Sequence, residues 1–199
     1  MSPEENPYRS PVATVLPNPN ELASANRFRN GILTVVLGTG AGVLLGAVTN
    51  AINGIVYPWH FSNFAPPGTK ELWRIAVVRG VEEGAVYGLV NSSIAAVALA
   101  YFQNSKQRPV SSWRVVLTGS ALVMVAWLLG GLLAIAIPGL GLQPTPNFYY
   151  DISSGFWTTD RRWVLWSIRG AVWGSPFATF ISCFWALRSK AVVTDSNLN

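Results

Sequence analysis

The chain has 199 residues, of which 50% are hydrophobic and only 12% are charged. Soluble domains carry about 25% charged residues, so this composition excludes a disordered chain and a coiled coil. The net charge of +5 is too small for a nucleic-acid-binding face built on basic patches. The composition therefore indicates a polytopic membrane protein.

The first 27 residues are rich in proline and polar residues, which predicts a disordered tail. This tail lacks the basic and then apolar order of a cleavable signal peptide, so the apolar stretch that follows, 31–57, is expected to be a retained helix. The stretch contains no charged residue. A bilayer core about 30 Å thick needs roughly 20 apolar residues in a helix, and this stretch is long enough to cross it.

Three further stretches meet the same requirement, at 73–102, 113–137 and 163–187. All are apolar on nearly every face, which is typical of helices that contact lipid. The sequence thus predicts an all-α fold, an integral membrane four-helix bundle. It comprises the tail 1–27, a four-span membrane domain over 28–190 and a polar tail over 191–199.

Basic residues in the tails and in or beside the connections predict the orientation of the bundle. Eight lie before the first span, around the second connection or after the last span: Arg9, Arg27, Arg29, Lys106, Arg108, Arg114, Arg188 and Lys190. Four lie on the opposite side: Lys70, Arg74, Arg161 and Arg162. The positive-inside rule then places both termini in the cytoplasm.

A short pattern occurs in both the second and the fourth span. Trp-x5-Arg-Gly-x3-Gly begins at Trp73 and again at Trp163, 90 residues later. We interpret the protein as two tandem two-helix units, related by an axis along the membrane normal because two spans preserve orientation. Trp113 opens the third span in the same way, so all three tryptophans are expected to be interface anchors.

Small residues recur four positions apart in three of the spans. Helices in lipid associate through close backbone approach, which such rows allow. Helix packing is therefore the expected role of these glycines, with a glycine-lined pore or a self-association face as alternatives. The predicted packing positions are Gly38, Gly42, Gly46, Gly80, Gly84, Gly88, Gly170 and Gly174.

Four ionisable residues lie inside the spans away from their ends, and their formal charges cancel: Arg79, Glu82, Glu83 and Arg169. A charge at this depth costs about 2.5–3.5 kcal/mol, so such residues usually face the bundle and pair. Arg79 can reach both glutamates, at i+3 and i+4, and we expect one glutamate also to bridge to Arg169. The alternatives are a polar cavity for an anion, a proton or a small solute, and arginines that extend to the headgroups.

The chain has one cysteine, Cys183, and one histidine, His60, far apart in the sequence. No intramolecular disulfide can form, and neither a metal site nor a haem site is predicted. The sequence contains no pairing of a nucleophile with a base, so no enzymatic activity and no cofactor are expected. The expected partners are the lipid bilayer and either another protein or a second copy of the chain.

The start of the chain, Glu5-Asn6-Pro7-Tyr8-Arg9-Ser10-Pro11, resembles the Asn-Pro-Tyr-x-Ser/Ala-Pro leader of small bacterial polytopic membrane proteins. This resemblance implies a bacterial cytoplasmic membrane and no particular activity. The four spans, the chain length and the Gly-x3-Gly row from Gly38 to Gly46 are also similar to the Tim17/Tim22/Tim23 translocase family. The long second outer connection and the Trp-x5-Arg-Gly pattern depart from that family, so no functional residue is carried over.

Two functions remain open from the sequence. The preferred expectation, based on the glycine rows and aromatic outer connections, is a structural or accessory subunit of a membrane complex, or a homo-oligomer. The alternative is a transporter or channel for a small solute or ion that uses the intramembrane arginine and glutamate residues.

Overall fold

The computed structural model describes residues 19–102, 110–137 and 159–195. This part of the chain holds four α-helices, one 3-10 helix and no strand: α1 (Pro19–Val56), η1 (Pro58–Phe64), α2 (Leu72–Phe102), α3 (Ser112–Ala136) and α5 (Thr159–Asp195). Each α-helix includes a segment long and apolar enough to cross a membrane. The prediction of an all-α protein with four spanning helices is therefore confirmed.

The helix bounds agree with the predicted spans in the middle of the chain and differ at its two ends. α2 and α3 begin and end within one residue of the predicted spans. α1 starts at Pro19, so the helix includes residues 19–27, for which the sequence predicted disorder. Proline is tolerated in the first turn because an N–H at that position would have no acceptor within the helix. The negative charge of Glu21 in the same turn interacts favourably with the positive end of the helix dipole. α5 likewise continues to Asp195, into the predicted tail.

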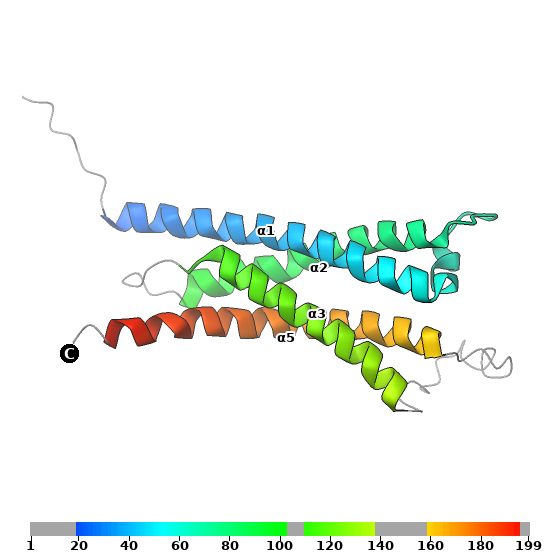
Figure 1. Ribbon diagram of the computed structural model, residues 1–199. Helices are drawn as coiled ribbons and strands as arrows, with labels where there is room; N and C mark the ends of the chain where they lie inside the picture. Colours follow the sequence, from blue (N-terminus) through cyan, green and yellow to red (C-terminus); the bar gives the residue numbers. More distant parts are fainter. Residues whose placement is uncertain (1–18, 103–109, 138–158, 196–199) are drawn as a thin grey trace, which may run out of the picture.

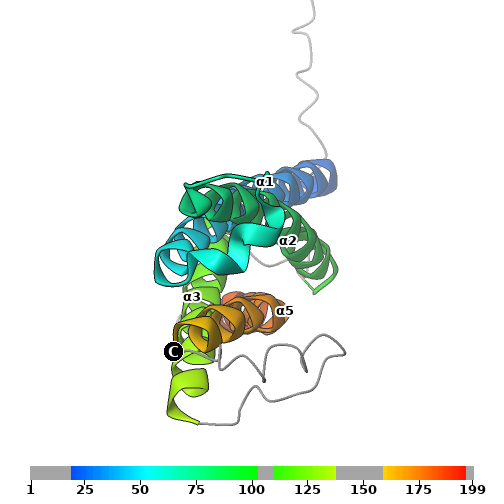
Figure 2. The same ribbon diagram turned by 90° about the vertical axis from the view of Figure 1, so that its right-hand side faces the viewer.

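The four helices form two hairpins. α1 packs along α2, and α3 packs along α5 (Figures 1 and 2). The hairpins meet less extensively, chiefly where α1 contacts α3 and α2 contacts α5. The closest neighbours in space are thus α1 with α2 and α3 with α5, and the space between the hairpins is only partly filled.

Side chains are distributed as expected for a bundle surrounded by lipid. The buried positions of α2 carry small residues: Ala76, Gly80, Gly84, Ser92 and Ala95 among them. Its large apolar side chains, such as Leu89 and Val97, point outward. Lipid is as apolar as leucine, so close contact between small residues, rather than burial of large ones, holds such helices together.

Glycine allows the two helices of each hairpin to meet backbone to backbone. A Cβ at Gly84 would overlap the carbonyl of Gly42, and one at Gly80 would overlap the carbonyl of Gly46. In the second hairpin, a Cβ at Gly170 would overlap the carbonyl of Ala126. All eight glycines predicted for helix packing lie at contacts between the two helices of a hairpin: Gly38, Gly42, Gly46, Gly80, Gly84, Gly88, Gly170 and Gly174.

Candidate functional site

A cavity of about 150 Å³ lies between the two hairpins and is lined by all four α-helices. We call it the central cavity. A single water needs only about 10–15 Å³ measured in this way, so the space holds several waters or a small solute. Six side chains of its lining carry polar groups from all four helices: Asn50, Glu83, Tyr87, Asn91, Ser120 and Ser175.

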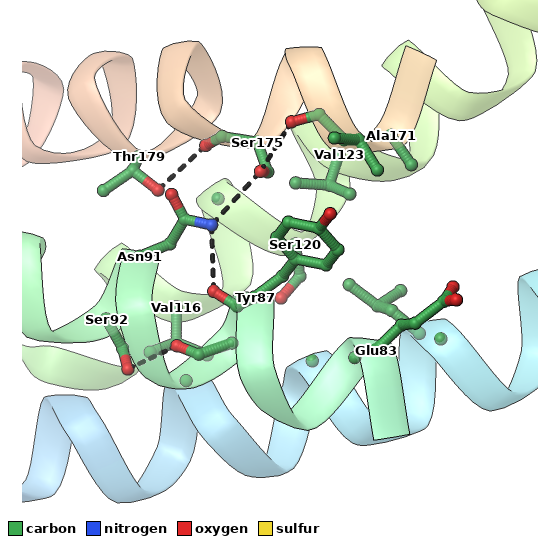
Figure 3. A pocket seen from close by; sticks show the side chains of 18 of the residues that line it. Glu83, Tyr87, Asn91, Ser92, Val116, Ser120, Val123, Ala171, Ser175 and Thr179 are labelled. Atoms are coloured by element: carbon green, nitrogen blue, oxygen red, sulfur yellow. Dashed lines mark hydrogen bonds between the residues drawn. The ribbon is translucent and has the colours of Figure 1, made fainter. Parts of the chain in front are cut away.

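Three of these side chains form a row along α2. Glu83, Tyr87 and Asn91 are spaced by four residues, so they share one face of the helix and lie along the central cavity (Figure 3). The glycine row of α2 faces α1 instead. The tight α1–α2 contact therefore fixes the rotation of α2 and directs the three polar side chains toward the other hairpin.

Asn91 connects the two hairpins across the central cavity. Its Nδ2 donates to the carbonyl of Tyr87 at 2.9 Å and to Ser175 Oγ at 3.1 Å (Figure 3). Pro176 has no N–H, so the α5 carbonyl four residues earlier, at Val172, loses its usual helical donor. The Ser175 hydroxyl donates to that carbonyl at 3.1 Å. The carbonyl that Pro176 leaves free therefore orients the Ser175 hydroxyl hydrogen, and the Ser175 oxygen accepts the hydrogen bond from Asn91.

Most hydroxyl groups around the central cavity donate to their own helix. Ser92 donates to the carbonyl of Gly88 at 2.6 Å, and Thr179 donates to that of Ser175 at 2.9 Å. Thr34, Thr49, Ser175 and Ser182 do the same on their helices. A hydroxyl has one donor and two acceptor lone pairs. These six hydroxyls therefore present oxygen acceptors to the space, whereas the indole N–H of Trp127, which also lines it, is a buried donor.

Asn50 of α1 also lines the central cavity and is buried, with 4% exposure. It packs beside Gly80, where a Cβ would lie 2.8 Å from the Cβ of Asn50. Because Asn50 belongs to the lining, its amide lies beside an occupant of the cavity.

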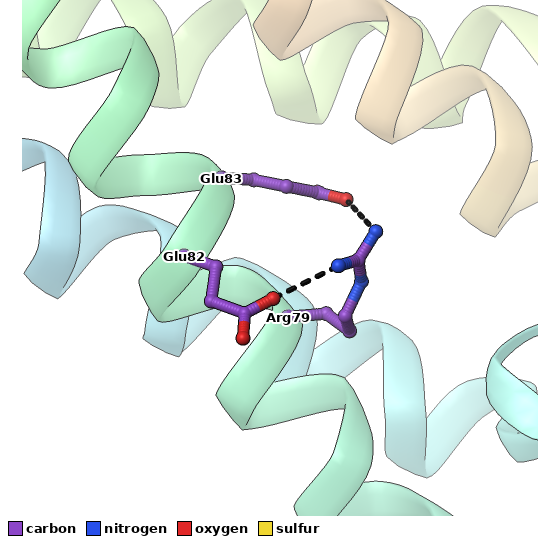
Figure 4. Close-up of polar contacts among 3 residues, drawn as sticks. All are labelled: Arg79, Glu82 and Glu83. Atoms are coloured by element: carbon purple, nitrogen blue, oxygen red, sulfur yellow. Dashed lines mark hydrogen bonds and ion pairs between the residues drawn. The ribbon is translucent and has the colours of Figure 1, made fainter. Parts of the chain in front are cut away.

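Arg79 lies between the two glutamates of its own helix. Its Nη1 is 2.8 Å from Glu82 Oε2, and its Nη2 is 3.7 Å from Glu83 Oε1 (Figure 4). Its guanidinium also stacks on the ring of Phe64 in η1, at 4.5 Å. The contact with Glu82 is a charge-assisted hydrogen bond, whereas the contact with Glu83 is too long for one. Of these three ionisable groups, Glu83 alone lines the central cavity.

Arg169 does not join this cluster, contrary to the expected bridge. Within the described part of the chain it forms no ion pair with either glutamate; it is exposed, and its guanidinium lies 5.2 Å from the Trp166 ring centroid. Ile168, Ala171 and Val172 occupy the cavity face of α5, so Arg169 projects from another face of the helix. The remaining cluster of one arginine and two glutamates has a formal charge of −1.

The three predicted anchor tryptophans occupy two kinds of position. Trp73 and Trp113 are exposed near the starts of their helices, at 47% and 55%. Trp163 instead packs inward, against Gly131 and edge-to-face with Trp127 at 5.5 Å between ring centroids. Gly131 has no side chain, so the Trp163 indole occupies the space beside it. Trp73 and Trp113 therefore lie where an interface anchor could contact the headgroups, whereas Trp163 packs inside its hairpin.

Sequence reasoning identified Glu83 but missed the polar groups that accompany it. Asn50, Tyr87, Asn91 and Ser175 are uncharged and were not singled out. Two features of the sequence could have indicated them. Glu83, Tyr87 and Asn91 follow one another at steps of four residues, and asparagine is rare inside apolar spans.

No protein-family model, curated protein or solved structure matches the chain. The resemblance of the first residues to a bacterial leader falls outside the described residues and stays a prediction.

Proposed function

We propose that the protein is a membrane transporter or channel for a small solute or ion, with a path through the central cavity. The observation that carries this proposal is a cavity between the hairpins whose lining, apolar over most of its surface, includes a carboxylate and several amide and hydroxyl groups. Ionisable and amide side chains inside a membrane bundle are costly and usually mark a pathway or a binding site. The proposal involves no catalytic step and no cofactor.

The depth of Glu83 supports this function. It lies ten residues along α2 from the exposed Trp73, which is about 15 Å at 1.5 Å per residue. That is half of a hydrocarbon core about 30 Å thick. Transporters commonly bind solutes near this midplane, between two structural repeats. The proposal includes a bacterial cytoplasmic membrane and cytoplasmic termini, supported by the leader resemblance and by the basic residues.

A structural or accessory subunit is the second candidate. It is favoured by a row of large aromatic side chains that point outward from α5: Trp173, Phe177, Phe180 and Phe184. Such a row gives a broad apolar face for another membrane protein. The central cavity favours the transport function over this candidate because a purely structural bundle has no need of a carboxylate and two amides around an internal space.

Flux through reconstituted vesicles tests the proposed function. The full chain is reconstituted into liposomes, and entry of potassium, chloride, ethanolammonium and glycerol is followed separately. Ser120→Trp fills the central cavity, whereas Leu117→Trp adds the same side chain to the exposed face of α3. We expect flux of at least one solute above that of empty liposomes, lost in Ser120→Trp and kept in Leu117→Trp. No flux of any of the four, or equal flux in both variants, contradicts the proposal and favours the accessory role.

A further inference from the structure

We infer that the central cavity selects a small organic monocation with N–H donors, such as a primary ammonium ion, and that Glu83 is its counter-ion. This inference rests on the proposed function and specifies the solute class. It follows from three properties of the site: its charge, the polarity of its hydrogen-bonding groups, and its size together with an aromatic ring.

The charge of the site favours a cation. Arg79 is neutralised at 2.8 Å by Glu82, a side chain that does not line the cavity. Glu83 is left with only the longer 3.7 Å contact to the same guanidinium. No lysine or arginine is among the described residues that line the cavity. An anion would therefore meet a cluster whose two carboxylates share a single arginine, whereas a monocation would restore neutrality at this depth.

The hydrogen-bonding groups of the lining favour an occupant that donates. The hydroxyls of Ser92, Ser175 and Thr179 donate their hydrogens to backbone carbonyls. Asn91 uses both amide hydrogens, on the Tyr87 carbonyl and on Ser175, which leaves its oxygen as an acceptor. An ammonium group has donors only, so it satisfies these acceptors and the Glu83 carboxylate together.

The size of the cavity and the position of Tyr87 favour an organic ion over a bare metal cation. The volume of about 150 Å³ exceeds what one dehydrated metal ion fills. Tyr87 lies one turn from Glu83 on the same face of α2 (Figure 3), and a tyrosine ring attracts cations within about 6 Å of its centroid. The amide of Asn50, which also lines the cavity, gives a further group for a hydroxyl or amine at the other end of the solute.

Calorimetric titration of the purified full chain in detergent tests this inference with three probes. Ethanolammonium carries a charge and N–H donors. Ethylene glycol has the same number of heavy atoms and no charge, and choline has a charge but no N–H donor. We expect ethanolammonium to bind at least about ten times more tightly than ethylene glycol, which corresponds to 1.4 kcal/mol, with choline between the two.

Two matched variants locate the selectivity. Glu83→Gln removes the cavity carboxylate, and Glu71→Gln makes the same change in an exposed ion pair with Arg74 before the first turn of α2. Glu83→Gln should abolish the preference for ethanolammonium, and Glu71→Gln should keep it. Glu83→Asp retains the charge and should retain the preference, which covers the case in which the glutamine variant does not fold.

The outcomes separate this inference from the proposed function. Equal binding of ethanolammonium and ethylene glycol by the wild-type chain overturns the inference, and so does a preference that survives in Glu83→Gln. Either result leaves the proposed function standing if Ser120→Trp still blocks flux of a solute. If no probe binds and no solute crosses the vesicle membrane, both the inference and the proposed function are overturned.

Discussion

Asn91 on α2 and Ser175 on α5 are joined by a hydrogen bond of 3.1 Å that crosses the boundary between the two hairpins. Ser112 Oγ also donates to the Asn30 carbonyl, and Ser167 Oγ to Asn53 Oδ1, across the same boundary. The Asn91–Ser175 bond should therefore contribute to the relative placement of the hairpins together with these two. Interhelical hydrogen bonds in membrane proteins are worth about 0.6 kcal/mol on average and up to about 1.7 kcal/mol. We expect Asn91→Leu and Ser175→Ala to couple by an amount in this range.

A double-mutant cycle on the unfolding free energy in detergent measures that coupling. Asn91→Leu with Ser182→Ala is the control pair, because Ser182 donates to its own helix and not to Asn91. Additive losses for Asn91 and Ser175 would mean that the bond contributes nothing to joining the hairpins.

The glycine contacts give a second prediction, through two alanine substitutions of opposite effect. At Gly84 a Cβ would overlap the backbone of α1, and backbone atoms cannot move aside cheaply. Gly84→Ala should therefore lower stability by about 1–3 kcal/mol, as overpacking does. At Gly40 a Cβ meets nothing within 4 Å, so Gly40→Ala should leave the melting temperature unchanged or raise it, because alanine favours helix. Thermal unfolding in detergent compares them, and a similar loss in both variants would contradict the packing account.

The charge cluster gives a third prediction. Because Arg169 lies against Trp166 and away from both glutamates, the effects of Arg169→Gln and Glu83→Gln on stability should simply add. Arg79→Gln and Glu82→Gln should instead show a positive coupling, since they share the 2.8 Å contact. Two double-mutant cycles, measured by chemical unfolding, distinguish the pairs. A measurable coupling between Arg169 and Glu83 would contradict this arrangement and support the ion pair that the sequence predicted.

Much of this fold could be predicted from the sequence because hydrophobic length alone defines the spans. The sequence pattern of the repeat matches well in only one helix of each unit, and the spacing of the helix contacts explains why. The contact between Gly46 and Gly80 joins residues 34 apart, whereas the equivalent contact between Ala126 and Gly170 joins residues 44 apart. A single offset of 90 residues therefore cannot align both helices of the two hairpins. The repeat itself stays a prediction.

The site was harder to predict because it depends on helix rotation. Sequence spacing correctly placed both glutamates within reach of Arg79, but it could not tell that Glu83 faces the cavity and Glu82 does not. The predicted bridge to Arg169 assumed that repeat symmetry brings the arginines together. Rotation is set by the glycine contacts between helices, which no pattern within one span reveals.

His60 in η1 should make stability depend on pH. Burial, and then the positive charge of Arg161, lower the pKa of His60 below its usual 6.5. The folded protein therefore favours neutral His60, and between the two pKa values the unfolded chain binds more protons. Stability from this group is present above pH 6.5 and is lost as the pH falls toward the lower, folded-state pKa.

The melting temperature of the wild-type chain should accordingly fall between pH 7.5 and pH 5, as the usual pKa near 6.5 is passed. His60→Gln should fall less over the same range, because it has no proton to bind. Parallel pH curves for the two proteins would show that His60 does not contribute.

Reactivity of cysteines placed on two faces of α3 tests the central claim, that a hydrated and negatively charged cavity lies between the hairpins. Replacing the single cysteine, Cys183→Ser, gives the background. Ser120→Cys then places a thiol in the central cavity, and Leu117→Cys places one on the exposed apolar face. Only a hydrated thiol ionises to the reactive thiolate. In reconstituted vesicles, we predict that Ser120→Cys reacts with a cationic methanethiosulfonate while Leu117→Cys stays unreactive, and that the cationic reagent is faster than an anionic one by about tenfold or more. Equal reactivity of the two cysteines, or a faster reaction with the anionic reagent, would contradict the account.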